Sequence, residues 1–293
     1  MIEGTVSRTA LKIARMALYF DLHPDFRALM PEGLAETNKK VLVALDEYKA
    51  WHGRVYASSA FSWLVDVTDR MLGPGYLIHF PLRKRFMDDQ VREGQEQGCT
   101  QLLVLGAGLD SLALRWAPKG LLCAELDHPS TGVAKQEATR LAGLQSDTLL
   151  QVQVDLAQRT VLQALESSIW DTSAPTVIVA EGLLMYLPPP AVEALFRGVA
   201  EAVGPGSRFA FSWLPQDEEG RVLLDRVTRW GVAAAGEPVN WSSKPSDVGP
   251  MLLANGWSLS PDIDVRARYL DGTPLEGMAT TSTERFSVAV RLP

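Results

Sequence analysis

The sequence predicts an α/β protein built around a mostly parallel β-sheet. Residues 102–105 form an uninterrupted apolar run, which is typical of a central strand covered on both faces. A turn with two glycines, Gly106-Ala107-Gly108-Leu109-Asp110, follows at once. From there to residue 213, strand-like and helix-like segments alternate, as they do in a doubly wound sheet.

Each expected element follows from its periodicity or from a turn signal. The strands are expected at 102–105, 121–127, 152–154, 176–180 and 208–213, with closing strands at 257–264 and 285–292. Helices are expected at 112–116, 190–203, 216–236 and 246–255. In the helix at 190–203, the apolar residues fall on one face, which we expect to pack on the sheet.

The chain divides into an N-terminal helical cap, residues 1–95, and a core, residues 96–293. Apolar residues recur at helical spacing after the possible caps Ser7 and Thr9, and the segment from His79 to Gln97 is again helical. We assign the cap to the substrate side and expect an inserted helical segment around residues 216–245. Both parts are expected to form one compact unit.

Composition restricts the class of partner. The 293 residues are 46% hydrophobic and carry a net charge of −7, and the longest basic cluster is Arg83-Lys84-Arg85, so nucleic acid is not an expected partner. Two cysteines, Cys99 and Cys123, offer neither a disulfide framework nor a metal site, and we interpret them as core thiols. No apolar run reaches transmembrane length, so we expect a cytoplasmic protein that does not bind a membrane. We also expect no bound metal.

The glycine turn indicates a nucleotide-like ligand, because backbone NH groups there can approach a ligand closely. A dinucleotide fingerprint requires a third glycine where this chain has Ser111, which disfavours an NAD-dependent oxidoreductase. Asp110 within the turn would repel phosphate and suits a cationic ligand such as S-adenosylmethionine. The alternative is a plain tight turn in a doubly wound sheet.

Acidic side chains follow four of the expected strands. They are Asp110, Asp127 with Glu125, Asp155, and Glu181. The carboxyl ends of parallel strands border one crevice, so we expect these acids to converge around an adenosine with a cationic tail. Alternatively, each acid is a solvated loop residue.

Several spaced motifs resemble those of the leucine carboxyl methyltransferase family. They are Leu105 to Asp110 with Leu114-Arg115, Glu125-Leu126-Asp127-His128-Pro129 with Lys135, Asp155-Leu156, and Ala180-Glu181-Gly182-Leu183-Leu184-Met185-Tyr186-Leu187. Upstream, Arg83 to Asp89 resembles the family's helical arginine motif, and Ser7 to Ala10 resembles its N-terminal start. The resemblance spans roughly residues 7–215, and the region after it matches less clearly.

This resemblance implies a Rossmann-like class I methyltransferase fold with a seven-stranded sheet whose last strand is antiparallel. It implies S-adenosylmethionine as cofactor, with Arg83 at its carboxylate, Glu181 at its amino end and Asp127 at its ribose. The cofactor-binding set is completed by Gly106, Ala107, Gly108, Asp110, Glu125, Asp155 and Leu156. Lys84 departs from the family pattern, which leaves Arg85 as an alternative to Arg83.

The family includes carboxyl methylators of polyketide acids, so the implied acceptor is a small carboxylic acid. A carboxylate is already ionised at neutral pH and needs no general base. Tyr186 is expected to orient the acceptor or to plug the strand–helix junction. Of two candidate bases, His79 and His128, the latter is interpreted as a structural residue.

Other functions remain open at this stage. They are methylation of a phenolic hydroxyl, which requires a base near the methyl group, methylation of a protein C-terminus, and cofactor binding without catalysis. The sequence does not determine the oligomeric state.

Overall fold

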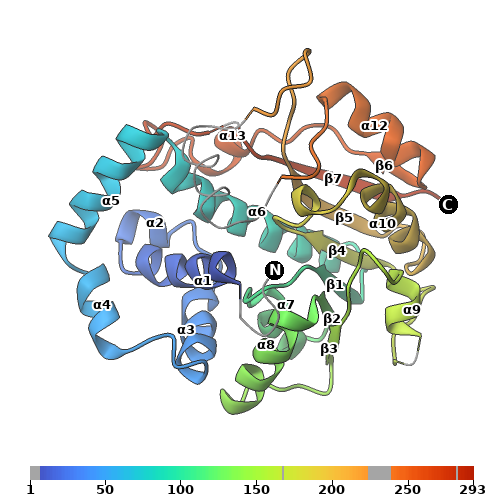
Figure 1. The fold of residues 1–293 in the computed structure, drawn as a ribbon, viewed down its shortest axis with the longest axis horizontal. Coiled ribbons are helices and arrows are strands. Elements are labelled where there is room, and N and C mark those ends of the chain that lie inside the picture. Colours follow the sequence, from blue (N-terminus) through green and yellow to red (C-terminus); the bar gives the residue numbers. More distant parts are fainter. Residues whose placement is uncertain (1–6, 167, 224–238, 282) are drawn as a thin grey trace.

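The computed structural model describes residues 7–166, 168–223, 239–281 and 283–293. It contains a seven-stranded sheet in the order β3-β2-β1-β4-β5-β7-β6 (Figure 1). The strands are β1 (Gln101–Leu105), β2 (Leu122–Asp127), β3 (Leu149–Gln153), β4 (Thr176–Ala180), β5 (Arg208–Trp213), β6 (Trp257–Leu259) and β7 (Arg285–Arg291). β1 to β5 pair in parallel, and β7 is antiparallel to both of its neighbours, β5 and β6. The expected mostly parallel sheet with an antiparallel last strand is therefore confirmed.

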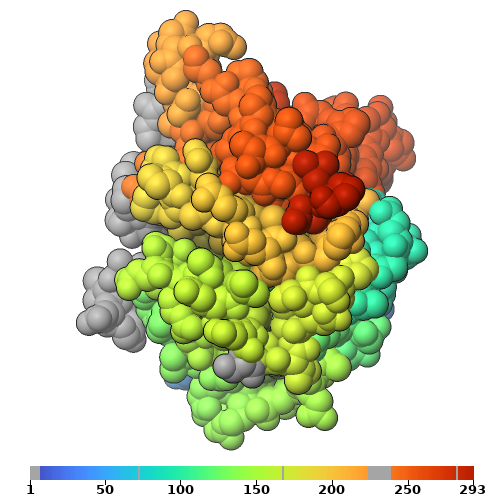
Figure 2. All heavy atoms as spheres, turned by 90° about the vertical axis from the view of Figure 1, so that its right-hand side faces the viewer, coloured from blue at the N-terminus to red at the C-terminus, as the bar shows by residue number. Residues whose placement is uncertain are grey.

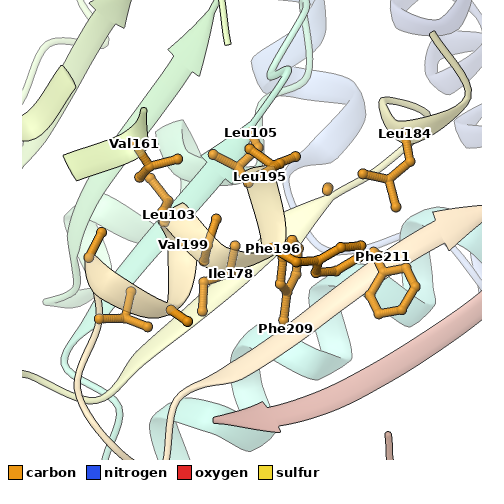
Figure 3. Close-up of a cluster of buried hydrophobic side chains, with 14 of the residues drawn as sticks. Leu103, Leu105, Val161, Ile178, Leu184, Leu195, Phe196, Val199, Phe209 and Phe211 are labelled. Carbon is orange, nitrogen blue, oxygen red and sulfur yellow. The ribbon is translucent and has the colours of Figure 1, made fainter. Parts of the chain in front are cut away.

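Alternate residues of the central strands build two separate cores, because successive side chains of a strand point to opposite faces. In β1, Leu103 and Leu105 join one apolar cluster, whereas Leu102 and Val104 join the other. The first cluster packs under α9 (Val161–Leu165), α10 (Pro189–Glu201) and α12 (Pro245–Ala254), and Figure 3 shows part of it. The second packs under α6 (Tyr76–Glu96), α7 (Leu112–Trp116) and α13 (Val265–Tyr269). Both predicted core thiols, Cys99 and Cys123, are free and buried in the second cluster.

The N-terminal helices form a layer beside the sheet. They are α1 (Arg8–Asp21), α2 (Pro24–Arg27), α3 (Leu34–Ala44), α4 (Ala50–Tyr56) and α5 (Ser59–Leu72). α1 and α3 pack on each other and on Ala138 of α8 (Pro129–Leu141). Of the two possible caps, Ser7 serves α1, since its Oγ accepts a hydrogen bond from Ala10 N at 3.2 Å. Viewed from the right-hand side of Figure 1, these helices are almost hidden by the rest of the molecule (Figure 2).

Three expected elements differ from the structure. Residues 216–223 are not helical: Gln216 pairs with Val222 across a turn in which Gly220 has a φ of +78°, and the remainder of the expected helix lies outside the described residues. The strand expected at 257–264 ends at Leu259, two residues before Pro261, which lacks the NH that a strand interior requires. The third strand begins at Leu149 rather than Val152, because Cys123 and Ala124 of β2 pair with Leu149 and Leu150. Within the described residues, no helix is long and apolar enough to cross a membrane.

A close approach of α6 to β4 generates a stability prediction. A Cβ on Gly94 would lie 2.2 Å from Cγ2 of the buried Val177, so Gly94→Ala forces the helix and strand apart. We expect this variant to lower the free energy of unfolding by about 1–3 kcal/mol in urea denaturation followed by circular dichroism. Gly249→Ala is the control, since its Cβ would meet only Leu259 Cδ2 at 3.8 Å and alanine favours the helix. Equal stability of the two variants would contradict the packing argument.

Candidate functional site

A cavity of about 830 Å³ opens at the carboxyl ends of the strands. Its floor comes from the turn after β1, from Asp127 at the end of β2, and from the loops after β3 and β4. Residues of α1 and α6 form the opposing wall. The cavity therefore lies between the sheet and the N-terminal helical layer, where ligands of open α/β sheets usually bind.

The glycine turn forms one side of this cavity. Gly106 and Gly108 have φ values of +63° and +50°, a backbone region that side chains rarely adopt. A Cβ on Gly106 would also approach Leu183 Cδ1 to 2.8 Å. Gly106 N donates to Leu126 O at 2.8 Å, which ties the turn to β2. Both glycines are therefore required by the local backbone, independently of any ligand.

Asp127 holds the same turn from the neighbouring strand. Its Oδ2 accepts from Gly108 N at 2.8 Å and its Oδ1 from His128 N at 2.7 Å. Burial raises the pKa of Asp127, and these two backbone NH groups oppose the rise. A carboxylate has about four acceptor sites, so Asp127 retains capacity for the hydroxyls of a ligand.

A buried network of charges lies at the other end of the glycine turn. Arg83 Nε is 2.9 Å from Glu181 Oε1, and Arg83 Nη1 is 2.8 Å from Glu284 Oε2. Lys84 Nζ pairs with Asp110 Oδ2 and lies 2.7 Å from Glu181 Oε1. We call these five residues the charge network. All five line the cavity.

Lys84 changes the role expected for Asp110. The Asp110 carboxylate was expected to face a cationic ligand, but Lys84 of the protein already occupies one of its oxygens. Sequence reasoning noted Lys84 only as a departure from the family pattern. In the sequence, Lys84 is a lysine directly after the predicted site residue Arg83. Its burial became visible only in the structure, where its side chain is 5% exposed.

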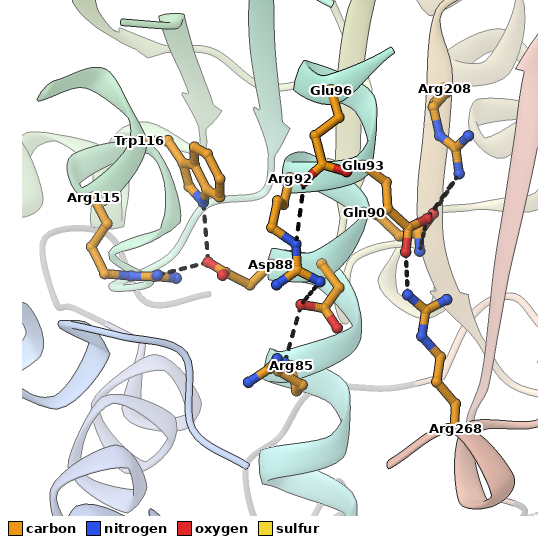
Figure 4. Close-up of polar contacts among 11 residues, drawn as sticks. Arg85, Asp88, Gln90, Arg92, Glu93, Glu96, Arg115, Trp116, Arg208 and Arg268 are labelled. Carbon is orange, nitrogen blue, oxygen red and sulfur yellow. Dashed lines mark hydrogen bonds and ion pairs between the residues drawn. The ribbon is translucent and has the colours of Figure 1, made fainter. Parts of the chain in front are cut away.

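Two predicted site residues lie outside the cavity lining. Glu125 is buried with Lys135, whose Nζ is 2.7 Å from Glu125 Oε1. Arg85, the alternative to Arg83 (Figure 4), pairs with Asp89 one turn further along α6, with 3.1 Å between Nε and Oδ1. The same figure shows Asp88, from the arginine motif, receiving hydrogen bonds from Arg115 and Trp116. This part of the motif fastens α6 to α7.

The remaining predicted residues line the cavity. Asp155 and Leu156 lie after β3, and Asp155 Oδ1 accepts from Ala157 N at 2.9 Å. Ala107 and Tyr186 also contribute to the wall, and the Tyr186 carbonyl accepts from Asn240 Nδ2 at 2.8 Å. Together with Arg83, Gly106, Gly108, Asp110, Asp127 and Glu181, they form one continuous surface.

The two candidate histidines have different partners. His128 Nδ1 accepts from Ser130 N at 3.2 Å and caps α8, which confirms the structural interpretation. His79 lies on α6, and its Nε2 is 2.7 Å from Glu284 Oε2. Sequence reasoning did not find Glu284, because nothing near residue 284 indicates a partner on α6.

The Asp110–Lys84 pair predicts a dependence of stability on acid pH. Burial raises the pKa of Asp110, but the charge and hydrogen bond of Lys84 outweigh it and lower that pKa to about 2. Since the unfolded value is about 3.9, the ionised carboxylate stabilises the fold above that pH, and the contribution disappears as pH falls from about 4 to about 2. We expect Asp110→Asn to be less stable than the unmodified chain at pH 6, by a margin that shrinks on acidification. Urea denaturation at a series of pH values measures this, and a constant margin would contradict it.

The Glu125–Lys135 pair predicts a second stability effect. Lys135→Met leaves the Glu125 carboxylate buried without its cation, so we expect the free energy of unfolding to fall by about 3–5 kcal/mol. Adding Glu125→Leu removes that charge and should recover part of the loss in the same denaturation measurement. If the double variant is no more stable than the single one, the loss comes from packing instead of charge.

The sequence is similar to those of curated proteins. A chain from Mycolicibacterium vanbaalenii, named "Putative S-adenosyl-L-methionine-dependent methyltransferase", is 33% identical over 206 residues, or 66% of each chain. A Mycobacterium marinum protein of the same name is 33% identical over 187 residues, or 61% of each chain. The chain thus spans less than two thirds of the length of these curated relatives.

Solved structures share the fold. A structure from Thermobifida fusca YX, named "putative methyltransferase", has a TM-score of 0.58 and 17% identity, covering 87% of this chain and 94% of its own. An O-methyltransferase family protein from Burkholderia thailandensis has a TM-score of 0.50 and 12% identity, covering 88% and 72%. The family model of leucine carboxyl methyltransferases matches residues 34–200, which is more than half of the sequence. The chain therefore belongs to the leucine carboxyl methyltransferase family.

Proposed function

We propose that this protein is an S-adenosylmethionine-dependent O-methyltransferase that acts on a small molecule. The observation that carries the proposal is the convergence of the glycine turn, Asp127 and the charge network on one cavity at the carboxyl ends of the strands. The names of its relatives support the cofactor.

The residues that line the cavity fit the chemistry of S-adenosylmethionine. Asp127 would accept from the ribose hydroxyls, and Asp155 with Leu156 would receive the adenine. The charge network holds three carboxylates against two cations, and an excess of negative charge suits a ligand whose ammonium and sulfonium outnumber its carboxylate.

Arg83 would bind the carboxylate of the cofactor through its terminal nitrogen Nη2. Its Nε and Nη1 are committed to Glu181 and Glu284, whereas Nη2 makes no hydrogen bond or ion pair with the described residues. A guanidinium carries five donor hydrogens, so a further contact is available. Arg83 would therefore contact the cofactor carboxylate through Nη2.

For the acceptor, we propose a small carboxylic acid, such as a polyketide acid. The bound cofactor supplies an electrophilic methyl group, and the protein holds the acceptor oxygen in line with it and excludes water. Arg8 and Lys12 on α1 line the cavity and form no ion pair within the described part of the chain. Their charge would attract an anionic acceptor, and Tyr186 would orient it.

Calorimetric titration tests the cofactor assignment. Asp127→Asn keeps the size of the side chain but removes its charge, so we expect the affinity for S-adenosylhomocysteine to fall by about tenfold, because hydrogen bonds to a charged group contribute about 1.5–3 kcal/mol. The control is Asp262→Asn, at a side chain that is 81% exposed. Unchanged affinity in Asp127→Asn, or binding of NAD without binding of S-adenosylhomocysteine, would contradict the proposal.

A further inference from the structure

His79 and Glu284 form a buried pair on the cavity wall. Their Nε2 and Oε2 atoms are 2.7 Å apart, and their side chains are 11% and 7% exposed. His79 comes from α6 and Glu284 directly precedes β7, so the pair joins segments 205 residues apart. Both residues line the cavity.

The pairing determines which nitrogen of the neutral imidazole carries the proton. A carboxylate only accepts hydrogen bonds, so Nε2 is the donor and Nδ1 keeps a lone pair. Nδ1 forms no hydrogen bond with any residue that the structure describes. Among those residues, the one ring contact of His79 is with Phe286, at 5.1 Å between ring centroids and an interplanar angle of 32°. An oriented imidazole with a free lone pair on a cavity wall is the arrangement of a general base.

Glu284 is held as a carboxylate by its surroundings. Burial raises its pKa, but the charge of Arg83 and the hydrogen bond from His79 outweigh burial and hold the pKa of Glu284 well below its usual range. The charged groups around the pair are Arg83 on the same helix and, beyond it, Glu181 after β4 and Lys84. The carboxylate therefore stays available to orient the imidazole.

We propose that His79 is a general base that enables this site to methylate a hydroxyl acceptor of the phenol or enol class. This inference rests on the proposed cofactor and adds a second acceptor chemistry to it. The acceptor O–H bond breaks and its proton moves to His79 Nδ1, while the acceptor oxygen forms a bond to the methyl carbon. The methyl–sulfur bond breaks with its electron pair remaining on sulfur, which becomes a neutral thioether. Glu284 is a positioning residue that acts through His79.

The surroundings of His79 suit an aromatic acceptor. Phe80 and Tyr76 on α6, together with Ile13 and Met16 on α1, line the same cavity. A phenol has a pKa of about 10 and is almost entirely protonated at neutral pH, so its methylation requires a base, whereas a carboxylate with a pKa of about 4 does not. The two acceptor classes therefore respond differently to the loss of His79.

The test uses His79→Gln, which retains a donor for Glu284 but has no basic nitrogen. Transfer of labelled methyl groups from S-adenosylmethionine is measured at pH 7 to a series of para-substituted phenols of graded acidity and to benzoate. We expect kcat for the weakly acidic phenols to fall by about 100-fold or more, with the affinity for S-adenosylhomocysteine unchanged. The loss should shrink for the most acidic phenols and as pH rises, because these acceptors ionise without help, and transfer to benzoate should not change.

Two further variants keep the result interpretable. His79→Asn replaces His79→Gln if the latter unfolds, and His23→Gln, outside the cavity lining, is a matched histidine control that should retain all activities. Cofactor binding without transfer to any phenol by the unmodified protein overturns the inference. So does an equal loss of phenol and benzoate transfer in His79→Gln, since that indicates a structural role. Absence of both cofactor binding and transfer to every acceptor instead contradicts the proposed function itself.

Discussion

The arrangement of the site depends on how the protein neutralises two cations buried on α6. Removing a charged group from water costs several kcal/mol unless an opposite charge and hydrogen bonds replace the solvent. Arg83 and Lys84 obtain these partners from three places: Asp110 after β1, Glu181 after β4 and Glu284 before β7. The charge network therefore ties one helix to the carboxyl edge of the sheet at three points.

The charge network explains why the polar side of the cavity is preformed. The carboxylates that would receive a cationic ligand are already held by hydrogen bonds and ion pairs, so little reorganisation is required when a ligand enters. Asp127 is fixed in the same way, by the backbone NH groups of Gly108 and His128. Fixed dipoles and charges of this kind stabilise a developing charge more effectively than mobile ones.

The strands were predictable because their signal is local. In β1 and β4 every residue is buried, and an uninterrupted apolar run is the expected pattern of a strand covered on both faces. The acids at the strand ends could also be placed, because parallel strands direct their carboxyl ends to one edge. Where no such periodicity exists, as at residues 216–223, the helix prediction was wrong.

The partners of the charged groups could not be predicted, because they come from segments that are distant in the sequence. Nothing in the sequence around Glu284 indicates that it meets His79 and Arg83 about 200 residues earlier. Likewise, Glu125 and Asp127 stand two residues apart on β2 and therefore point to the same face of the sheet, but Asp127 is the last residue of the strand. One meets Lys135 in the interior and the other meets the cavity. Their positions along the strand, one inside it and one at its carboxyl end, separate their roles.

The histidine–carboxylate pair on the cavity wall has a chemical consequence that depends on the substrate. Methyl transfer to a carboxylate moves no proton, so the pair would contribute only to packing and charge balance during that reaction. Methyl transfer to a hydroxyl releases a proton that a base must accept, and in the proposed role His79 would accept it through Nδ1. Both reactions would use the same cofactor-binding residues. They differ in whether the acceptor loses a proton. His79 and Arg83 both lie on α6 and share Glu284 Oε2, so the carboxylate that orients the proposed base also neutralises a buried cation.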